Sequence, residues 1–241
     1  DAVGHTDLIN YGVDILYLGL MVHLIFVALK GRADDLVEHR RRLRIIFVVA
    51  MAVATSMTVL ADTVLQPLHT EFLLTLRARC EVVFLRGNHE SVFLEARDNR
   101  FALMNWCTPM YGGEATLDSY GAKEMSDVPE SHWQFLEETK LYLETDEHIF
   151  VHAGLNAELG LEEQSELTML WQFFDDPQPH CSGKVMVCGH SSLESGIPES
   201  VGHAICIDTG ACKGKWLTCL EVMTGRYWQA SEDGKVRQGE L

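Results

Sequence analysis

Asparagine and histidine residues follow three short apolar runs of this chain. Asn88 and His89 come after residues 82–85 by way of a glycine turn, which would present an amide oxygen and an imidazole at a sheet edge. His152 and His190 each end another strand-like run. Neutral imidazole nitrogens and hard oxygen atoms are suitable ligands for a metal ion that activates water. These residue types therefore favour metal-assisted hydrolysis.

Each of these residues has a simpler interpretation when it is taken alone. An Asn-His pair after a strand is usually a turn, and a histidine at a strand end is usually a surface residue. Four further histidines match no motif, and we expect structural roles for them: His132, His148, His180 and His203. Function is favoured only when the order and the flanking residues of the three sites are considered together.

The order and the flanking residues resemble those of a known family. Gly-Asn-His-Glu after an apolar strand is similar to the third signature of the calcineurin-like metallophosphoesterases. Arg86 before it makes the segment resemble their phosphoprotein phosphatase branch, the serine/threonine protein phosphatases. The resemblance covers residues 68–241, and the first 66 residues do not match. Further segments follow in the expected order: Phe150-Val151-His152-Ala153-Gly154, Val187-Cys188-Gly189-His190-Ser191, and Ile205-Cys206-Ile207-Asp208-Thr209-Gly210 with Trp216-Leu217-Thr218.

The resemblance implies a role for each matching residue. Asn88, His152 and His190 would bind metal. His89 would lie beside the metals and protonate the leaving alkoxide, and Arg86 would bind two phosphate oxygens with its guanidinium. The family uses two divalent metal ions, with Mn²⁺ as the first choice here and Fe or Zn as alternatives. The implied activity is hydrolysis of phosphomonoesters by metal-activated water, and the implied substrate is a phosphorylated protein or a nucleoside polyphosphate.

Two other motifs of that family are missing. The chain has neither Asp-x-His near its start nor Gly-Asp-x-x-Asp-Arg-Gly before Asn88. Asp62 is a candidate remnant of the bridging carboxylate, but Leu65 and Gln66 stand where the family has Asp and Arg. Three neutral donors balance the charge of a dication poorly, so we expect one bound ion or none. The alternative function is a catalytically inactive, membrane-tethered phosphatase-like binding module, or a truncated or fused fragment.

The elements that must position these residues have the alternation of an α/β domain. Polar residues at the C-terminal tips of strands place a site on loops at one edge of the sheets. The resemblance implies a layered metallophosphoesterase fold over residues 67–241, with two packed mixed β-sheets flanked by helices. Helices are predicted at residues 91–106 and 131–138, and strands at residues 82–85, 141–143, 149–152, 184–188, 203–208, 216–222 and 227–230.

The first 66 residues differ from the rest. Residues 15–29 and 45–61 are apolar and flank an arginine-rich stretch at residues 30–44. This pattern is typical of an apolar helical hairpin, so one interpretation is membrane association through residues 15–65. The other is that these runs are buried helices or strands of a soluble core. We predict a cytoplasmic protein, and the alternative is association with the inner membrane with the phosphatase-like part in the cytoplasm.

The composition limits the class of partner. A chain of 241 residues with 47% hydrophobic content can bury a sizeable core, and a net charge of −16 argues against nucleic acid as a partner. The charged residues are scattered, as on a solvated surface. The seven cysteines all follow residue 66 and include no Cys-x-x-Cys pair. We therefore expect reduced core thiols in a cytosolic compartment.

Overall fold

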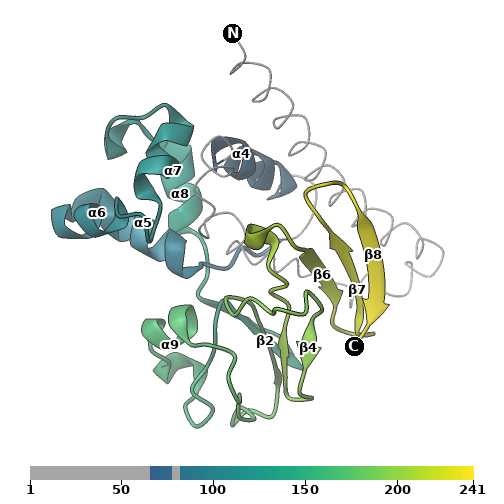
Figure 1. The fold of residues 1–241 in the computed structure, drawn as a ribbon. Coiled ribbons are helices and arrows are strands. Elements are labelled where there is room, and N and C mark those ends of the chain that lie inside the picture. The colour runs from purple at the N-terminus through teal and green to yellow at the C-terminus, as the bar shows by residue number, and fades with distance from the viewer. Residues whose placement is uncertain (1–65, 78–81) are drawn as a thin grey trace. The chain divides into compact units, whose positions relative to one another are not determined.

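The computed structural model describes residues 66–77 and 82–241, which Figure 1 draws in colour. The predicted hairpin over residues 15–65 and the candidate carboxylate of Asp62 lie outside the described residues. Within the described ranges, no helix has the length and apolar character needed to cross a membrane. The membrane hypothesis concerns the remaining residues and stays a prediction.

Helices come first along the described chain, and strands dominate after residue 140. The α-helices are α4 (Gln66–Arg77), α5 (Asn88–Asp98), α6 (Arg100–Trp106), α7 (Gly113–Tyr120), α8 (Glu130–Glu137) and α9 (Glu166–Trp171). Short 3-10 helices are η2 (Met125–Asp127), η3 (Leu161–Glu163) and η4 (Ala211–Lys213). The strands are β1 (Tyr142–Glu144), β2 (His148–Val151), β3 (Val185–Cys188), β4 (Glu199–Ser200), β5 (Ala204–Cys206), β6 (Leu217–Glu221), β7 (Arg226–Ala230) and β8 (Val236–Glu240).

The described chain divides into two compact units. One unit contains Ser192–Glu199 and Ile207–Leu241, and with them strands β6, β7 and β8. The other contains the described residues up to Ser191 together with Ser200–Cys206, and with them helices α4 to α9. All of the predicted site residues belong to this second unit. The predicted domain boundary after residue 66 stays a prediction, because residues 1–65 are outside the described part.

Aromatic side chains form much of the core of the helical region. Phe93 of α5 stacks on Trp106 of α6, with ring centroids 4.6 Å apart, and packs on Trp133 of α8 at the same distance. The side chain of Asn99 accepts hydrogen bonds from two backbone N–H groups of α6, at 3.0 and 3.2 Å. This cap begins α6 where α5 ends. The single helix predicted over residues 91–106 was therefore wrong, because the extended backbone of Asn99 divides it.

Helix α8 confirms the helix predicted over residues 131–138. Its buried face carries His132, which is 1% exposed. The His132 ring contacts the Tyr120 hydroxyl through Nδ1 at 2.9 Å and the Glu71 carboxylate through Nε2 at 3.1 Å. These contacts connect α8 to α7 and α4, so His132 has the structural place that we expected.

The five-stranded sheet is mixed and has the order β1-β2-β3-β5-β4. β1 runs antiparallel to β2, whereas β2, β3 and β5 run parallel to one another. All four residues of β2 are buried, as expected for a parallel strand that is covered on both faces. Parallel strands end at the same edge of a sheet, so β2 and β3 bring His152 and His190 to one edge. These strands confirm the predictions at residues 149–152, 184–188 and 203–208.

The predicted strand at residues 82–85 is reduced to one isolated bridge. Leu85 pairs with Lys140 in parallel, and Arg86 N donates a hydrogen bond to the Lys140 carbonyl at 2.7 Å. Among the described residues this pairing extends no further, and the chain enters α5 at Asn88. The prediction of a strand was therefore wrong here, but Asn88 still follows a partly buried apolar run.

A second, three-stranded sheet is antiparallel, with the order β6-β7-β8. Strands β6 and β7 confirm the predictions at residues 216–222 and 227–230. The sequence did not predict β8, because its residues are mostly polar and exposed. Tyr227 pairs with Gly239, where an added Cβ would overlap the Tyr227 hydroxyl. The α/β class, with a mixed five-stranded sheet, a three-stranded sheet and helices, is confirmed.

Candidate active site

Three of the predicted site residues converge on one atom. Nε2 of His152 lies 3.0 Å from Oδ1 of Asn88 and 3.2 Å from Nδ1 of His190. Asn88 and His152 are buried, with 5% and 2% of their surface exposed. The three residues are far apart in the sequence, so the fold brings together an oxygen and two nitrogens that can all donate electron pairs.

A close approach of backbone and side chains positions Asn88. It is the first residue of α5, and the preceding Gly87 has an extended backbone. Gly87 N donates a hydrogen bond to Oε2 of the buried Glu90 at 2.9 Å, which closes the first turn of the helix. A Cβ at Gly87 would overlap that oxygen and would lie 3.2 Å from Cε1 of His152. Glycine is therefore needed here for space.

Two strand ends position the histidines. His152 follows β2, and its carbonyl accepts a hydrogen bond from Gly189 N at 2.9 Å, which fastens the ends of β2 and β3 together. His190 has φ of +63°, in the left-handed region that few residues other than glycine adopt. Such a conformation costs about 1–3 kcal/mol and persists only where the surroundings enforce it. The strained residue is the one whose Nδ1 reaches His152.

The three histidine side chains of the site influence one another. Burial, then the neighbouring His190 and His89, together lower the pKa of His152 to about 3. Burial and then His190 also lower the pKa of His89, whereas a hydrogen bond with the backbone of Tyr111 raises it. Both shifts favour the neutral imidazole, which is the form that can bind a metal ion.

His89 lies beside this group with one nitrogen unused. Its Nδ1 is buried and, within the described residues, has no hydrogen-bond partner. A buried polar atom without a partner costs about 1–3 kcal/mol, so native proteins seldom retain one without a use. The Tyr111 ring packs edge-on against the His89 ring, with centroids 6.1 Å apart. His89 is thus held in place while its Nδ1 remains available.

The donor set fits one divalent metal ion. Ligands about 2.1 Å from an ion lie about 3.0 Å apart when their bonds meet at right angles. The spacings at Nε2 of His152, 3.0 and 3.2 Å, are close to that value. No group of three His, Cys, Asp or Glu side chains suited to a metal occurs in the described ranges. Only His152 and His190 are of those residue types here, so a bound ion would depend on their two nitrogens and the Asn88 oxygen.

Arg86 does not join this group in the structure. Its Nε donates to Oγ1 of Thr139 at 3.1 Å, and its Nη2 donates to the carbonyls of Leu136 and Glu137 at 3.3 and 3.0 Å. These acceptors lie at the C-terminal end of α8 and just after it, where helix carbonyls lack partners within the helix. Arg86 thus caps α8, and its predicted role in binding phosphate stays a prediction.

Sequence reasoning missed three aromatic residues at the site. Tyr111 contacts His89 with ring centroids 6.1 Å apart, and Trp171 contacts His190 at the same distance. Phe173 contacts His190 at 5.4 Å. The sequence hinted at two of them only by the cluster of aromatic residues at 171–174, which on its own indicates core packing.

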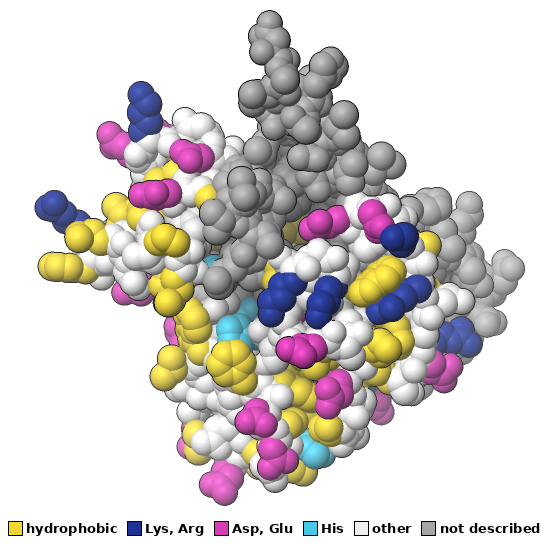
Figure 2. All heavy atoms as spheres, viewed as in Figure 1, with side chains coloured by type: hydrophobic (Ala, Val, Ile, Leu, Met, Phe, Trp, Pro, Cys, Tyr) yellow, Lys and Arg dark blue, Asp and Glu magenta, His cyan; other side chains and the backbone are white. Residues whose placement is uncertain are grey.

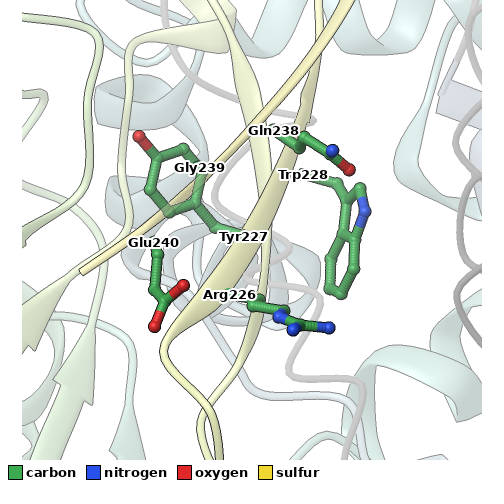
Figure 3. A pocket seen from close by; sticks show the side chains of 6 residues that line it. All are labelled: Arg226, Tyr227, Trp228, Gln238, Gly239 and Glu240. Carbon is green, nitrogen blue, oxygen red and sulfur yellow. The ribbon is translucent and has the colours of Figure 1, made fainter.

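A separate hollow lies on the three-stranded sheet. It has a volume of about 500 Å³ and is lined by residues of β7 and β8 (Figure 3). Arg226 and Glu240 place opposite charges along it, beside Tyr227 and Trp228. It contains none of the predicted site residues, so the candidate chemistry rests on the group around His152.

Comparisons with known proteins leave the family open. No family model matches the chain, and no curated protein matches it. A solved structure of a cold-active protein tyrosine phosphatase is similar at 14% identity with a TM-score of 0.48, over 74% of this chain and 63% of that chain, which is less than two thirds of it. A structure named as a diadenosine tetraphosphatase is similar at 15% identity with a TM-score of 0.39, over 70% and 71% of the two chains. Likenesses at these values assign neither a family nor an activity.

Proposed function

We propose that the chain is a phosphoester hydrolase that uses one divalent metal ion, bound by Asn88, His152 and His190. The observation that supports the proposal is the convergence of Asn88 Oδ1 and His190 Nδ1 on Nε2 of His152. When bound, the ion would supply Lewis-acid activation of water and would offset charge on the phosphate. Mn²⁺ is the first choice, and Fe or Zn are the alternatives.

The chain's own residues would bind the ion and donate the proton to the leaving group. Asn88, His152 and His190 would hold the ion, and the first two are buried, where electrostatic effects are stronger than in water. His89 would donate a proton to the leaving alkoxide from Nδ1, the atom that has no partner among the described residues. Burial disfavours the protonated ring, but a phosphate dianion beside it would favour that form again.

Arg86 would bind phosphate only by exchanging its present hydrogen bonds. They fasten the end of α8, so a direct role in catalysis would require α8 to lose that cap. We therefore include Arg86 in the proposal as a residue that supports the fold beside the site. The wider substrate choice, a phosphorylated protein or a nucleoside polyphosphate, and a cytoplasmic location remain part of the proposal.

A second candidate is a binding module that holds a metal ion without turnover. The observation that favours it is the character of the donor set, because Asn88, His152 and His190 are all neutral. A lone dication held by neutral donors keeps most of its charge, which suits binding of an anion as well as catalysis.

One experiment separates these candidates. The parent chain, Asn88→Ala and His152→Ala would be assayed with added Mn²⁺ for bound metal and for turnover of p-nitrophenyl phosphate. The control is His203→Ala, which changes a histidine that contacts the Pro177 carbonyl. Loss of metal and turnover in the two site variants alone supports the hydrolase. Bound metal without turnover in the parent supports the binding module, and neither metal nor turnover in the parent contradicts both.

A further inference from the structure

The aromatic rings and the imidazoles form a continuous chain of contacts at the site. His89 contacts Tyr111 at 6.1 Å, Tyr111 contacts Trp171 at 6.2 Å, and Trp171 contacts His190 at 6.1 Å between ring centroids. His190 then contacts His152 at 5.0 Å. All of these residues belong to one compact unit. The site thus has a polar side, where the metal donors lie, and an aromatic side.

Phe173 extends the aromatic side to the surface. Its side chain is 70% exposed, although its ring lies 5.4 Å from the ring of His190 and is inclined to it by 36°. The next residue fixes its position, because Phe174 N donates to Oγ of Ser191 at 2.6 Å. On the face drawn in Figure 2, apolar side chains (yellow) lie next to exposed histidine atoms (cyan). A large apolar ring is thus held in water directly beside a proposed metal ligand.

We infer that the site takes aryl phosphates, whose aromatic ring packs on Phe173 while the phosphate lies at Asn88, His152 and His190. This inference rests on the proposed function and names its substrate class. Aromatic rings pair favourably at centroid distances of about 4.5–7 Å. In an aryl ester a single oxygen joins the ring to phosphorus, so a ring whose phosphate lies near His190 stays within reach of Phe173, which is 5.4 Å from His190.

The reaction is hydrolysis of the bond between phosphorus and the aryl oxygen. Water adds its oxygen to phosphorus, and the P–O bond to the aryl group breaks with its electron pair on the phenolate. Nδ1 of His89 gives the phenolate a proton, one hydrogen of water stays on the inorganic phosphate, and the proton that water loses returns to His89 through the solvent. The products are a phenol and phosphate, and the reaction needs no co-reactant.

Binding of phosphonates tests the inference without requiring turnover. The dissociation constants of phenylphosphonate and cyclohexylphosphonate would be measured by calorimetry in the presence of Mn²⁺. The two probes have similar size and the same anionic group, but only the first is aromatic. We expect phenylphosphonate to bind about two- to tenfold more tightly, the range expected of one aromatic pair.

Two leucine variants complete the test. Phe173→Leu keeps an apolar side chain and should remove the preference for the phenyl probe. Phe101→Leu changes another exposed ring, on α6, and should leave the preference unchanged. Equal binding of the two probes to the parent, or a preference that survives Phe173→Leu, would overturn the inference while the phosphate site stands. Binding of neither probe would overturn the proposed function as well.

Discussion

Gly87→Ala tests the close packing that positions the candidate metal donors. The backbone of Gly87, with φ −93° and ψ 172°, is one that alanine adopts freely, so any cost comes from the added methyl group alone. That methyl group would overlap Oε2 of Glu90 and would lie 3.2 and 3.3 Å from Cε1 and Nδ1 of His152. Glu90 is 2% exposed and has little room to retreat.

The size of the effect follows from two terms. Insertion of a methyl group into a well-packed site costs about 1–3 kcal/mol. Displacement of the Glu90 carboxylate also weakens its hydrogen bond with Gly87 N, of a kind worth about 1.5–3 kcal/mol. When the Glu90 carboxylate moves away, it relieves the overlap but loses its hydrogen bond, so the two costs do not add in full. We therefore expect the free energy of unfolding to fall by about 2–4 kcal/mol. The affinity for Mn²⁺ should fall as well, because the ring of His152 must shift.

The assay is urea denaturation followed by circular dichroism, together with a Mn²⁺ titration of the folded protein. Gly160→Ala is a matched control, since Gly160 also precedes a short helix and also donates its N–H to a glutamate three residues later, Glu163. A Cβ at Gly160 would lie 3.4 Å from Oε2 of Glu163, an ordinary contact, so its cost should stay within about 0.5 kcal/mol. Equal costs for the two substitutions, or an unchanged Mn²⁺ affinity for Gly87→Ala, would refute the reasoning.

Three further predictions concern other parts of the described chain. Arg86→Lys should lower the free energy of unfolding by about 1–3 kcal/mol in denaturant titrations, because lysine cannot reproduce the hydrogen bonds at the end of α8. Unchanged stability with weaker phosphate binding would instead show that Arg86 binds the substrate. Asn99→Ala should cost about 0.5–2 kcal/mol by the same assay through loss of the α6 cap, and the absence of any cost would show that α5 and α6 do not depend on it. Burial lowers the pKa of His148 in the folded state. As pH falls below about 6.5, the ordinary pKa of histidine, His148 is therefore protonated in the unfolded state before it is protonated in the folded state, and the free energy of unfolding decreases. His148→Gln should therefore make stability fall less steeply below that pH. An unchanged dependence of stability on pH would contradict the role given to His148.

The strands that carry the site could be predicted from the sequence. The apolar runs before His152 and His190 are long enough and apolar enough to specify buried strands, and parallel strands must end at a common edge. The approach of His152 to His190 is therefore a consequence of a pattern that is visible in the sequence, whereas Asn88 follows a run that forms only one isolated bridge.

Other features depend on contacts that no local pattern specifies. Residues 91–106 contain no proline or glycine that would indicate a break. They form two helices because the side chain of Asn99 caps the second one. The guanidinium of Arg86 donates hydrogen bonds to carbonyls at the end of α8, about fifty residues later in the chain. The exposed ring of Phe173 beside His190 is likewise a result of tertiary structure, because the sequence alone does not distinguish it from a core aromatic residue.

Equilibrium binding of Mn²⁺ tests the central claim most directly. The purified parent chain, His152→Ala and the control His203→Ala would be titrated with Mn²⁺ and followed by electron paramagnetic resonance, which reports the free ion. The proposed site predicts one bound ion per chain for the parent and for His203→Ala, and loss of that ion in His152→Ala. No bound ion in the parent, or an ion whose affinity is the same in all three proteins, would contradict the claim that Asn88, His152 and His190 form a metal site.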